Sequence, residues 1–155
     1  MRNHSSNLSR RTLVAGALVL ASLSGQVRAA ENPVFSTGGV AINGYDAVAY
    51  FASNAPVKGD PAIVSDWNGA IWQFSSQSNK AAFDAAPEKY APQYGGYCAY
   101  AVSKGAKANT EPSAFTIVGD KLYLNYSLDV RAIWGKDIAG NVANADKNWP
   151  GLIGQ

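Results

Sequence analysis

Apolar residues gather in two pairs of short segments along the chain, and a two-residue turn divides each pair. The first turn is Asn68-Gly69, which supplies the two positive φ angles that a type I′ hairpin requires. The second turn is Gly119-Asp120, and it interrupts a run of apolar and β-branched residues in the same way. The pattern therefore predicts two β-hairpins, one formed by residues 62–67 and 70–74 and one by residues 114–118 and 121–125.

A helical pattern follows the first hairpin. Ser76 or Ser78 can cap a helix that runs to about Ala86, because a serine side chain can accept a free N–H group of the first turn. The inner face of this helix would consist of Ala82, Phe83 and Ala86.

A second helix is expected from Leu128 to about Asp137, with Ser127 as its cap and three large inward residues, Val130, Ile133 and Trp134. The other segments are predicted as a short strand at 40–42, a helical turn or short helix at 87–90, a loop or irregular strand at 95–98, a loop at 103–113, and one more short helix within 140–155. Together these elements predict a small single α+β domain with two β-hairpins and two to three helices.

The first 30 residues follow a different pattern. Two adjacent arginines, Arg10 and Arg11, precede an uncharged stretch that is shorter than the roughly 20 apolar residues of a membrane-spanning helix. Ala29 and Ala30 then offer small side chains to a signal peptidase. This order resembles a twin-arginine (Tat) signal, or an ordinary secretory signal with two chance arginines. We expect cleavage after Ala29 or Ala30, export to the periplasm without stable membrane insertion afterwards, and a domain over residues 31–155.

Removal of that signal changes the charge and the available chemistry. The chain has 13 Lys+Arg and 11 Asp+Glu residues, but four basic residues and the single histidine lie in the first 30. The remaining domain has a net charge of −2, which gives no basis for nucleic-acid binding. Without histidine it has no Ser-His-Asp or Cys-His catalytic centre, and no phosphate-binding glycine motif follows a predicted strand. The sequence therefore does not favour an enzyme.

Cys98 is the only cysteine of the chain. It cannot form an internal disulfide, and a zinc site of four cysteines, or of two cysteines and two histidines, is excluded within one chain. As a thiolate it could bind a soft metal such as Cu(I), or react as a redox thiol if a cation such as Lys104 lay nearby. The alternative is a small buried apolar side chain, because free cysteine is among the most buried residue types.

The rings and glycines around Cys98 form one candidate pocket wall, made of Tyr94, Gly95, Gly96, Tyr97 and Tyr100. Such residues could line a ligand or cofactor pocket, or could be core aromatics beside a sharp turn. Asp46 could supply an oxygen ligand to a metal ion, or could accept backbone N–H groups as turn carboxylates commonly do. The candidate metal ligands are therefore Cys98 and Asp46.

Three motifs carry a family resemblance. Residues 72–83 read Trp-Gln-Phe-Ser-Ser-Gln-Ser-Asn-Lys-Ala-Ala-Phe, residues 87–90 read Pro-Glu-Lys-Tyr, and residues 44–48 read Gly-Tyr-Asp-Ala-Val. Over residues 42–90 they resemble the YHS domain, which is similar to the cysteine-rich TRASH-type metal modules. The resemblance implies a YHS/TRASH-like fold with a C-terminal extension. The longer pattern, with Tyr-Gly-Gly-Tyr-Cys-Ala and Asn-Trp-Pro-Gly, resembles an exported bacterial subgroup that includes selenoproteins, whose selenocysteine would fall at Cys98.

The same resemblance shows what this chain lacks. Metal-binding relatives carry cysteines at positions that here hold Ala49, Ser75 and Asn79. None of these residues is a thiolate, so the soft-metal site that the resemblance implies for the family is absent from this chain.

The leading prediction is an exported YHS-domain protein that binds or handles copper or another soft metal ion through Cys98. Oxygen atoms of Tyr or Asp, or Cys98 of a second chain in a homodimer, would complete the coordination. One alternative is a thiol redox protein that acts through Cys98. The other is a non-catalytic module that binds a small ligand or a protein through its tyrosine surface.

Overall fold

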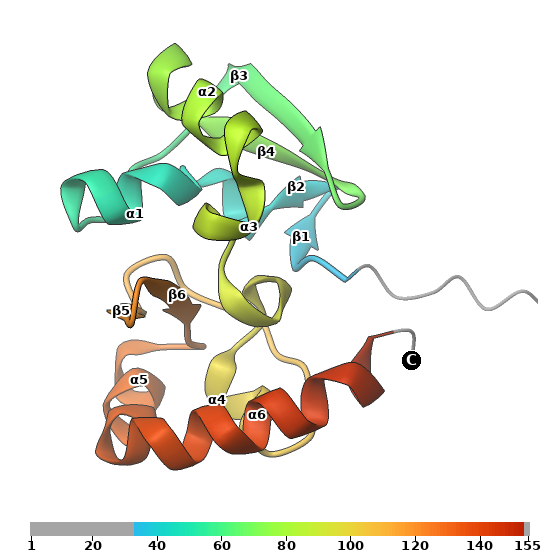
Figure 1. The fold of residues 1–155 in the computed structure, drawn as a ribbon, viewed down its shortest axis with the longest axis vertical. Coiled ribbons are helices and arrows are strands. Elements are labelled where there is room, and N and C mark those ends of the chain that lie inside the picture. The colour runs from blue at the N-terminus through green and yellow to red at the C-terminus, as the bar shows by residue number, and fades with distance from the viewer. Residues whose placement is uncertain (1–32, 154–155) are drawn as a thin grey trace, which may run out of the picture.

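A computed structural model describes residues 33–153, and the signal predicted for the first 30 residues lies outside the described residues. The fold is α+β, as the sequence predicts, with a four-stranded mixed sheet, a separate β-hairpin and three main helices. Figure 1 shows the sheet in one half of the molecule and the separate hairpin in the other half. We call these parts the sheet half and the hairpin half.

The sheet has the strand order β1-β2-β4-β3, with β1 at Ser36–Thr37, β2 at Val40–Ala41, β4 at Ala70–Phe74 and β3 at Asp60–Trp67. β3 and β4 form the first predicted hairpin, and Asn68 and Gly69 take φ angles of 51° and 77° in its turn. β2 pairs with β4 in parallel. The strand predicted at 40–42 ends one residue early, because a 3₁₀ turn begins at Ile42.

The helices of the sheet half are α1 at Ala47–Ser53, α2 at Gln77–Ala85 and α3 at Pro87–Tyr90. Ser76 is the cap of α2, since its hydroxyl oxygen accepts the N–H of Asn79, and this choice between the two predicted serines settles the start of the helix. Phe83 is buried on the inner face, as predicted, whereas Ala82 and Ala86 are only partly buried.

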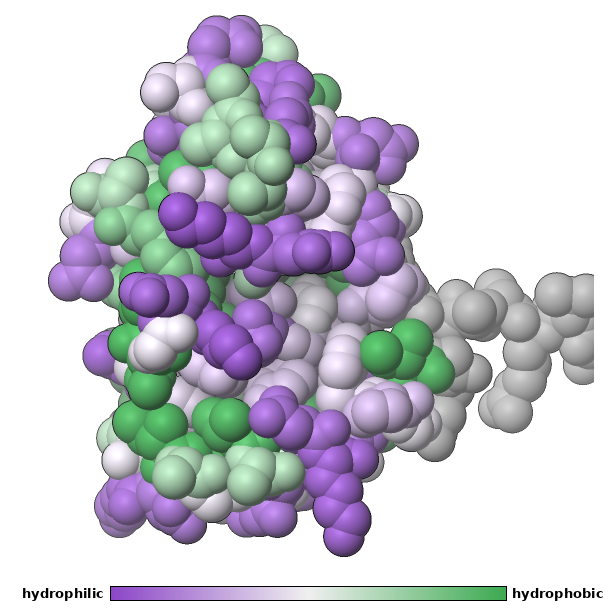
Figure 2. All heavy atoms as spheres, in the orientation of Figure 1, coloured by the Kyte–Doolittle hydropathy of each residue, from purple (hydrophilic) through white to green (hydrophobic). Residues whose placement is uncertain are grey.

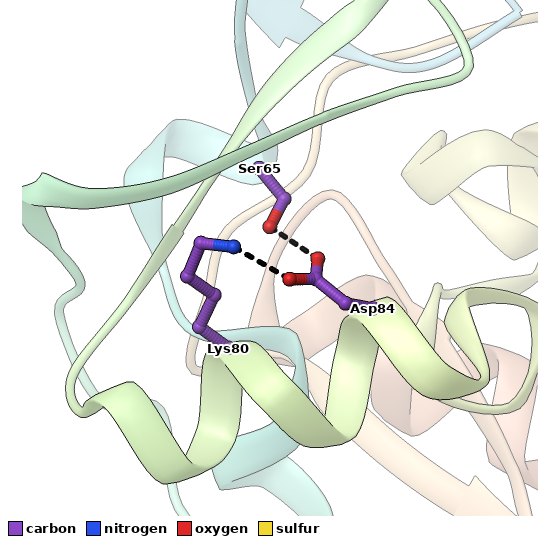
Figure 3. Close-up of polar contacts among 3 residues, drawn as sticks. All are labelled: Ser65, Lys80 and Asp84. Carbon is purple, nitrogen blue, oxygen red and sulfur yellow. Dashed lines mark hydrogen bonds and ion pairs between the residues drawn. The ribbon is translucent and has the colours of Figure 1, made fainter.

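Helix α2 is attached to the hairpin of β3 and β4 by rings on one side and polar groups on the other. The ring of Phe83 lies 5.0–5.7 Å, centroid to centroid, from the rings of Trp67, Trp72 and Phe74. Figure 3 shows the polar contact, in which Lys80 pairs with Asp84 of the same helix and Ser65 of β3 donates to the second oxygen of that carboxylate. The hydrogen bond from Lys80 lowers the pKa of Asp84. Because the cluster is exposed, the rings provide most of the attachment.

The hairpin half contains β5 at Phe115–Val118 and β6 at Lys121–Leu124, which form the second predicted hairpin. Its helices are α4 at Ala99–Ser103, α5 at Leu128–Trp134 and α6 at Ile138–Leu152, with 3₁₀ turns at Gln93–Gly96 and Gly135–Asp137. Ser127 caps α5 through the N–H of Val130, as predicted.

Residues 95–98 form an irregular loop, one of the two predicted alternatives: Gly95 and Gly96 end a distorted 3₁₀ turn, and Cys98 then caps α4. Two other expectations for this half are wrong in detail. Ile133 does not face inward: its side chain is 45% exposed, whereas Trp134 is fully buried. The tail holds the 15-residue α6 and not merely a short helix. Its Gly, Asn and Pro residues have low helical propensity, but Asn148 donates to the carbonyls of Val102 and Ser103, so that packing on α4 decides the outcome.

Strand β6 joins the two halves of the molecule. Leu122 and Leu124 belong to the apolar cluster of the sheet half, while Tyr123 between them belongs to the cluster of the hairpin half. Alternate side chains of a strand point to opposite faces, so this short strand contributes to both cores. The two halves therefore pack as one folded body around β6.

Within residues 33–153 no helix has the length and apolar character that crossing a bilayer demands.

Gly95 offers a test of how the lead-in segment is held. Its φ is +62°, a Cβ there would lie 1.8 Å from the carbonyl oxygen of Pro33, and its own carbonyl accepts the N–H of Phe35. We expect Gly95→Ala to lower the free energy of unfolding by about 3 kcal/mol or more, because a backbone clash adds to the left-handed strain.

Gly105 provides the matched control. It has a similar φ of +82°, but a Cβ there would meet nothing within 4 Å. Gly105→Ala should cost only about 1–2 kcal/mol in a urea unfolding experiment. Equal losses in the two variants would show that the contact with Pro33 contributes nothing.

Candidate functional site

Asp46 is a buried carboxylate at the centre of a hydrogen-bond cluster. Its side chain is fully buried, and Oδ1 accepts the N–H groups of Val48 and Ala49 at 2.9 and 3.2 Å as the cap of α1. Oδ2 accepts the N–H and the hydroxyl of Ser75 at 2.8 and 2.6 Å, and the Nδ2 of Asn79 at 2.8 Å. Five donors thus surround the two oxygens. Of the two predicted roles of Asp46, metal ligand and acceptor of N–H groups, the second matches these contacts.

The sequence explains why these groups meet. Asp46 precedes α1, where a short acidic side chain can accept the free N–H groups of the first turn. Ser75 follows β4 and Asn79 lies in the first turn of α2, so both approach the carboxylate from the other side. The three positions at which the family resemblance expects cysteines, Ala49, Ser75 and Asn79, are therefore all bonded to one carboxylate.

Cys98 lies in a separate cluster in the hairpin half. Its side chain is only 1% exposed, its Sγ accepts the N–H of Ala101 at 3.5 Å, and its thiol donates to Oδ1 of Asn125 at 3.6 Å. The same Oδ1 accepts the N–H of Tyr100 at 3.1 Å. The N–H of Tyr100 must point to an acceptor, so the side-chain oxygen of Asn125, and not its amino group, faces the start of α4. The thiol of Cys98 therefore also meets an acceptor and donates its proton.

No metal-binding cluster includes this thiol in the described part of the chain. Residues 33–153 contain no group of three or more His, Cys, Asp or Glu side chains that could hold a metal ion. Cys98 and Asp46 have no hydrogen-bond partner in common, since they belong to different halves of the molecule. The ammonium group of Lys104 lies over the ring of Tyr100, 5.0 Å from its centroid.

The tyrosines near Cys98 mostly contribute to packing. Tyr94 and Tyr123 are buried, and the hydroxyl of Tyr94 donates to Asp146 at 2.8 Å. Tyr97 is half-buried between the rings of Phe35 and Trp149. These contacts bind the turn before Cys98 to α6.

Backbone conformation and close packing together explain why glycine occupies both positions of the pair before Cys98. Gly95 and Gly96 have φ angles of +62° and +86°, and a Cβ on Gly96 would lie 2.6 Å from Cγ2 of Ile42. The close approach that the sequence suggested is therefore to the protein's own chain near Pro33 and Ile42.

Two surface hollows lie away from the thiol, and sequence reasoning missed both. One of about 390 Å³ is lined by Thr116, Leu128, Arg131, Ala132, Trp134, Gly135 and Ile138. The other, of about 380 Å³, is lined by Val48, Phe51, Ala52, Lys89, Tyr90 and Asp120. Both combine apolar walls with a charged side chain, which is the usual make-up of a ligand site. The second hollow combines three segments that are distant in the sequence, so no local motif marks it. The first is lined mainly by residues 128–138, and its walls meet only because α5, the following turn and the start of α6 pack against Thr116.

Comparison of the chain with protein-family patterns, with characterised proteins and with solved structures finds no match. The YHS resemblance therefore depends on the motifs quoted above and stays a prediction.

Asp46 should be essential for stability. We expect Asp46→Asn to lower the free energy of unfolding by about 3 kcal/mol, because the new amide group would turn a donor toward donors inside a buried cluster. Asp66→Asn, at an exposed position of β3, is the matched control and should change stability by less than about 0.5 kcal/mol. Guanidinium unfolding of the two variants measures both effects, and similar small losses would contradict the assignment.

Three tyrosines predict a loss of stability in alkali. Burial raises the pKa of Tyr50, Tyr94 and Tyr123 above the ordinary value of 10.0, and the neighbouring Asp146 raises the last two further. A pKa that is raised by folding stabilises the fold fully below pH 10.0, and this stabilisation disappears as the pH rises through the folded-state values.

The free energy of unfolding should therefore decrease above pH 10, and Tyr94→Phe should reduce the slope of that decrease. Urea unfolding at several pH values between 8 and 11 measures this slope. A slope that is identical in the variant would mean that Tyr94 ionises equally in the folded and unfolded chain.

Proposed function

We propose that this protein is an exported, YHS-like module that binds a ligand on its surface and uses no thiol chemistry. The observation that carries the proposal is the state of Cys98, whose thiol is 1% exposed and already bonded to Ala101 and Asn125. A metal-binding or redox thiol must reach solvent and ionise before it acts. The geometry of Cys98 instead suits a cap of α4.

The cluster around Asp46 supports the YHS-like part of the proposal. Ala49 is distant in sequence from Ser75 and Asn79, yet all three donate hydrogen bonds to the same carboxylate. Positions that would gather around a metal cation in the relatives gather here around an anion, with N–H and O–H donors in place of thiolates. This arrangement keeps a buried charge at the junction of α1 and α2 while it removes the soft-metal ligands.

The surface hollows support the binding part of the proposal. Both have volumes within the range of about 300–1,000 Å³ that small-molecule sites occupy. The tyrosines near Cys98 are less suited, because Tyr94 is buried and lysines lie over the rings of Tyr97 and Tyr100. We therefore assign ligand binding to the hollows and a packing role to these rings.

The reaction of Cys98 with N-ethylmaleimide tests the proposal. We expect the folded protein to react at least about 100-fold more slowly than a variant with an added surface thiol, Ser78→Cys, because Cys98 becomes accessible only when α4 opens. Denaturant should abolish the difference. Added Cu(I) should leave the rate unchanged, and Cys98→Ser should keep the fold, because serine can also cap α4 and donate to Asn125.

Two results would contradict the proposal. Fast labelling of Cys98 that Cu(I) blocks would support a metal-handling thiol. Fast labelling that Cu(I) does not block would support thiol redox chemistry.

A further inference from the structure

The larger hollow, which we call the α5 groove, has an apolar wall and one cation. Leu128 and Ala132 of α5 and Ile138 of α6 form the wall, and Leu128 is 53% exposed. Figure 2 shows hydrophobic side chains gathered at the end of the molecule where Figure 1 places α5 and the start of α6. No acidic residue lines the groove, so Arg131 determines the sign of its charge.

The guanidinium group of Arg131 is held in place by two contacts. Its Nε donates to the hydroxyl oxygen of Thr116 at 3.2 Å, and its central carbon lies 5.9 Å from the ring centroid of Phe115. Its terminal amino groups have no acceptor among residues 33–153. A guanidinium group fixed at Nε with free terminal N–H groups can bind a carboxylate through two parallel hydrogen bonds, and it loses little side-chain entropy in doing so.

Trp134 supplies a second observation in the same groove. Its side chain is fully buried and lines the groove, and its indole Nε1–H has no hydrogen-bond acceptor in the described structure. A buried donor without an acceptor in the protein is uncommon, and the side-chain amide of Asn125 is in the same state. Because the Trp134 side chain lines the groove beside Arg131, its indole N–H signal can report whether the groove is occupied.

We propose that the α5 groove binds a small amphipathic carboxylate, with its carboxylate on Arg131 and its apolar body against Leu128, Ala132 and Ile138. This inference rests on the proposed binding function and names the ligand class of one hollow. An acid with a short alkyl chain fits a groove of about 390 Å³ better than a long-chain lipid would. The charge favours an anion over a neutral molecule of the same shape, because the one charged side chain of the groove is a cation.

Octanoate is the probe for a calorimetric titration of the protein, with 1-octanol and acetate as the neutral and tailless comparisons. We expect saturable binding of octanoate, binding of 1-octanol that is at least about ten-fold weaker, and no measurable binding of acetate. In a ¹⁵N spectrum, the indole N–H signal of Trp134 should shift with octanoate and the signals of Trp67 and Trp72 should not.

Three variants locate the site. Arg131→Gln should weaken octanoate to the level of 1-octanol, and Leu128→Ser, at an exposed position, should weaken both probes. Lys136→Gln is the control, because it removes the same charge from an exposed neighbour outside the groove and should leave octanoate binding unchanged.

Several outcomes would overturn the inference: no saturable binding of octanoate, equal binding of 1-octanol, or full affinity in Arg131→Gln. These outcomes are separate from the thiol experiment. If Cys98 stays unreactive and octanoate fails to bind, the inference about the ligand class is contradicted but the proposed function is not. A reactive, copper-protected Cys98 would remove the proposed function itself.

Discussion

A buried carboxylate controls how the sheet half is assembled. Among the described residues no cation pairs with Asp46, and its two oxygens are surrounded only by N–H and O–H donors. Those donors come from the start of α1, from the end of β4 and from the first turn of α2. The starts of two helices therefore meet at one negative group, which satisfies two N–H groups that the start of α1 leaves free and one side-chain amide of α2. The sheet is also placed relative to that group, since β4, which ends beside it, pairs with both β2 and β3.

In the hairpin half, the uncharged side chain of Asn125 has a comparable role. Asn125 follows β6 and its side-chain oxygen accepts both the thiol of Cys98 and the N–H of Tyr100, while its backbone bonds to Ala114 and Glu111. One residue thus ties the start of α4 and the preceding loop to the hairpin. The thiol fits this position because cysteine is small, apolar on one side and a weak donor on the other. In the structure, the cysteine that marks this segment packs against the start of α4 and makes two weak hydrogen bonds there.

The sequence reveals the fold class and both hairpins because those features depend on local signals. Asn68-Gly69 requires a particular turn whatever surrounds it, and Ser76 and Ser127 cap helices through atoms three residues away. The length of α6 was not predictable in this way, since its support comes from contacts with α4 about 45 residues earlier. The α5 groove was not predictable for the same reason. The Arg131 side chain is oriented by Thr116, which belongs to another element, the strand β5.

The position of α6 in the chain also has a consequence for biosynthesis. The core of the hairpin half includes Ala145 and Leu152, and the carbonyl of Leu152 accepts the ammonium of Lys107. This core therefore cannot close while residues 145–152 are still inside the ribosome. The sheet half can collapse once Leu124 has emerged, because its cluster draws on residues 34–124. The hairpin half therefore closes after the sheet half, and the inner side of α4 stays accessible to chaperones until α6 has packed against it.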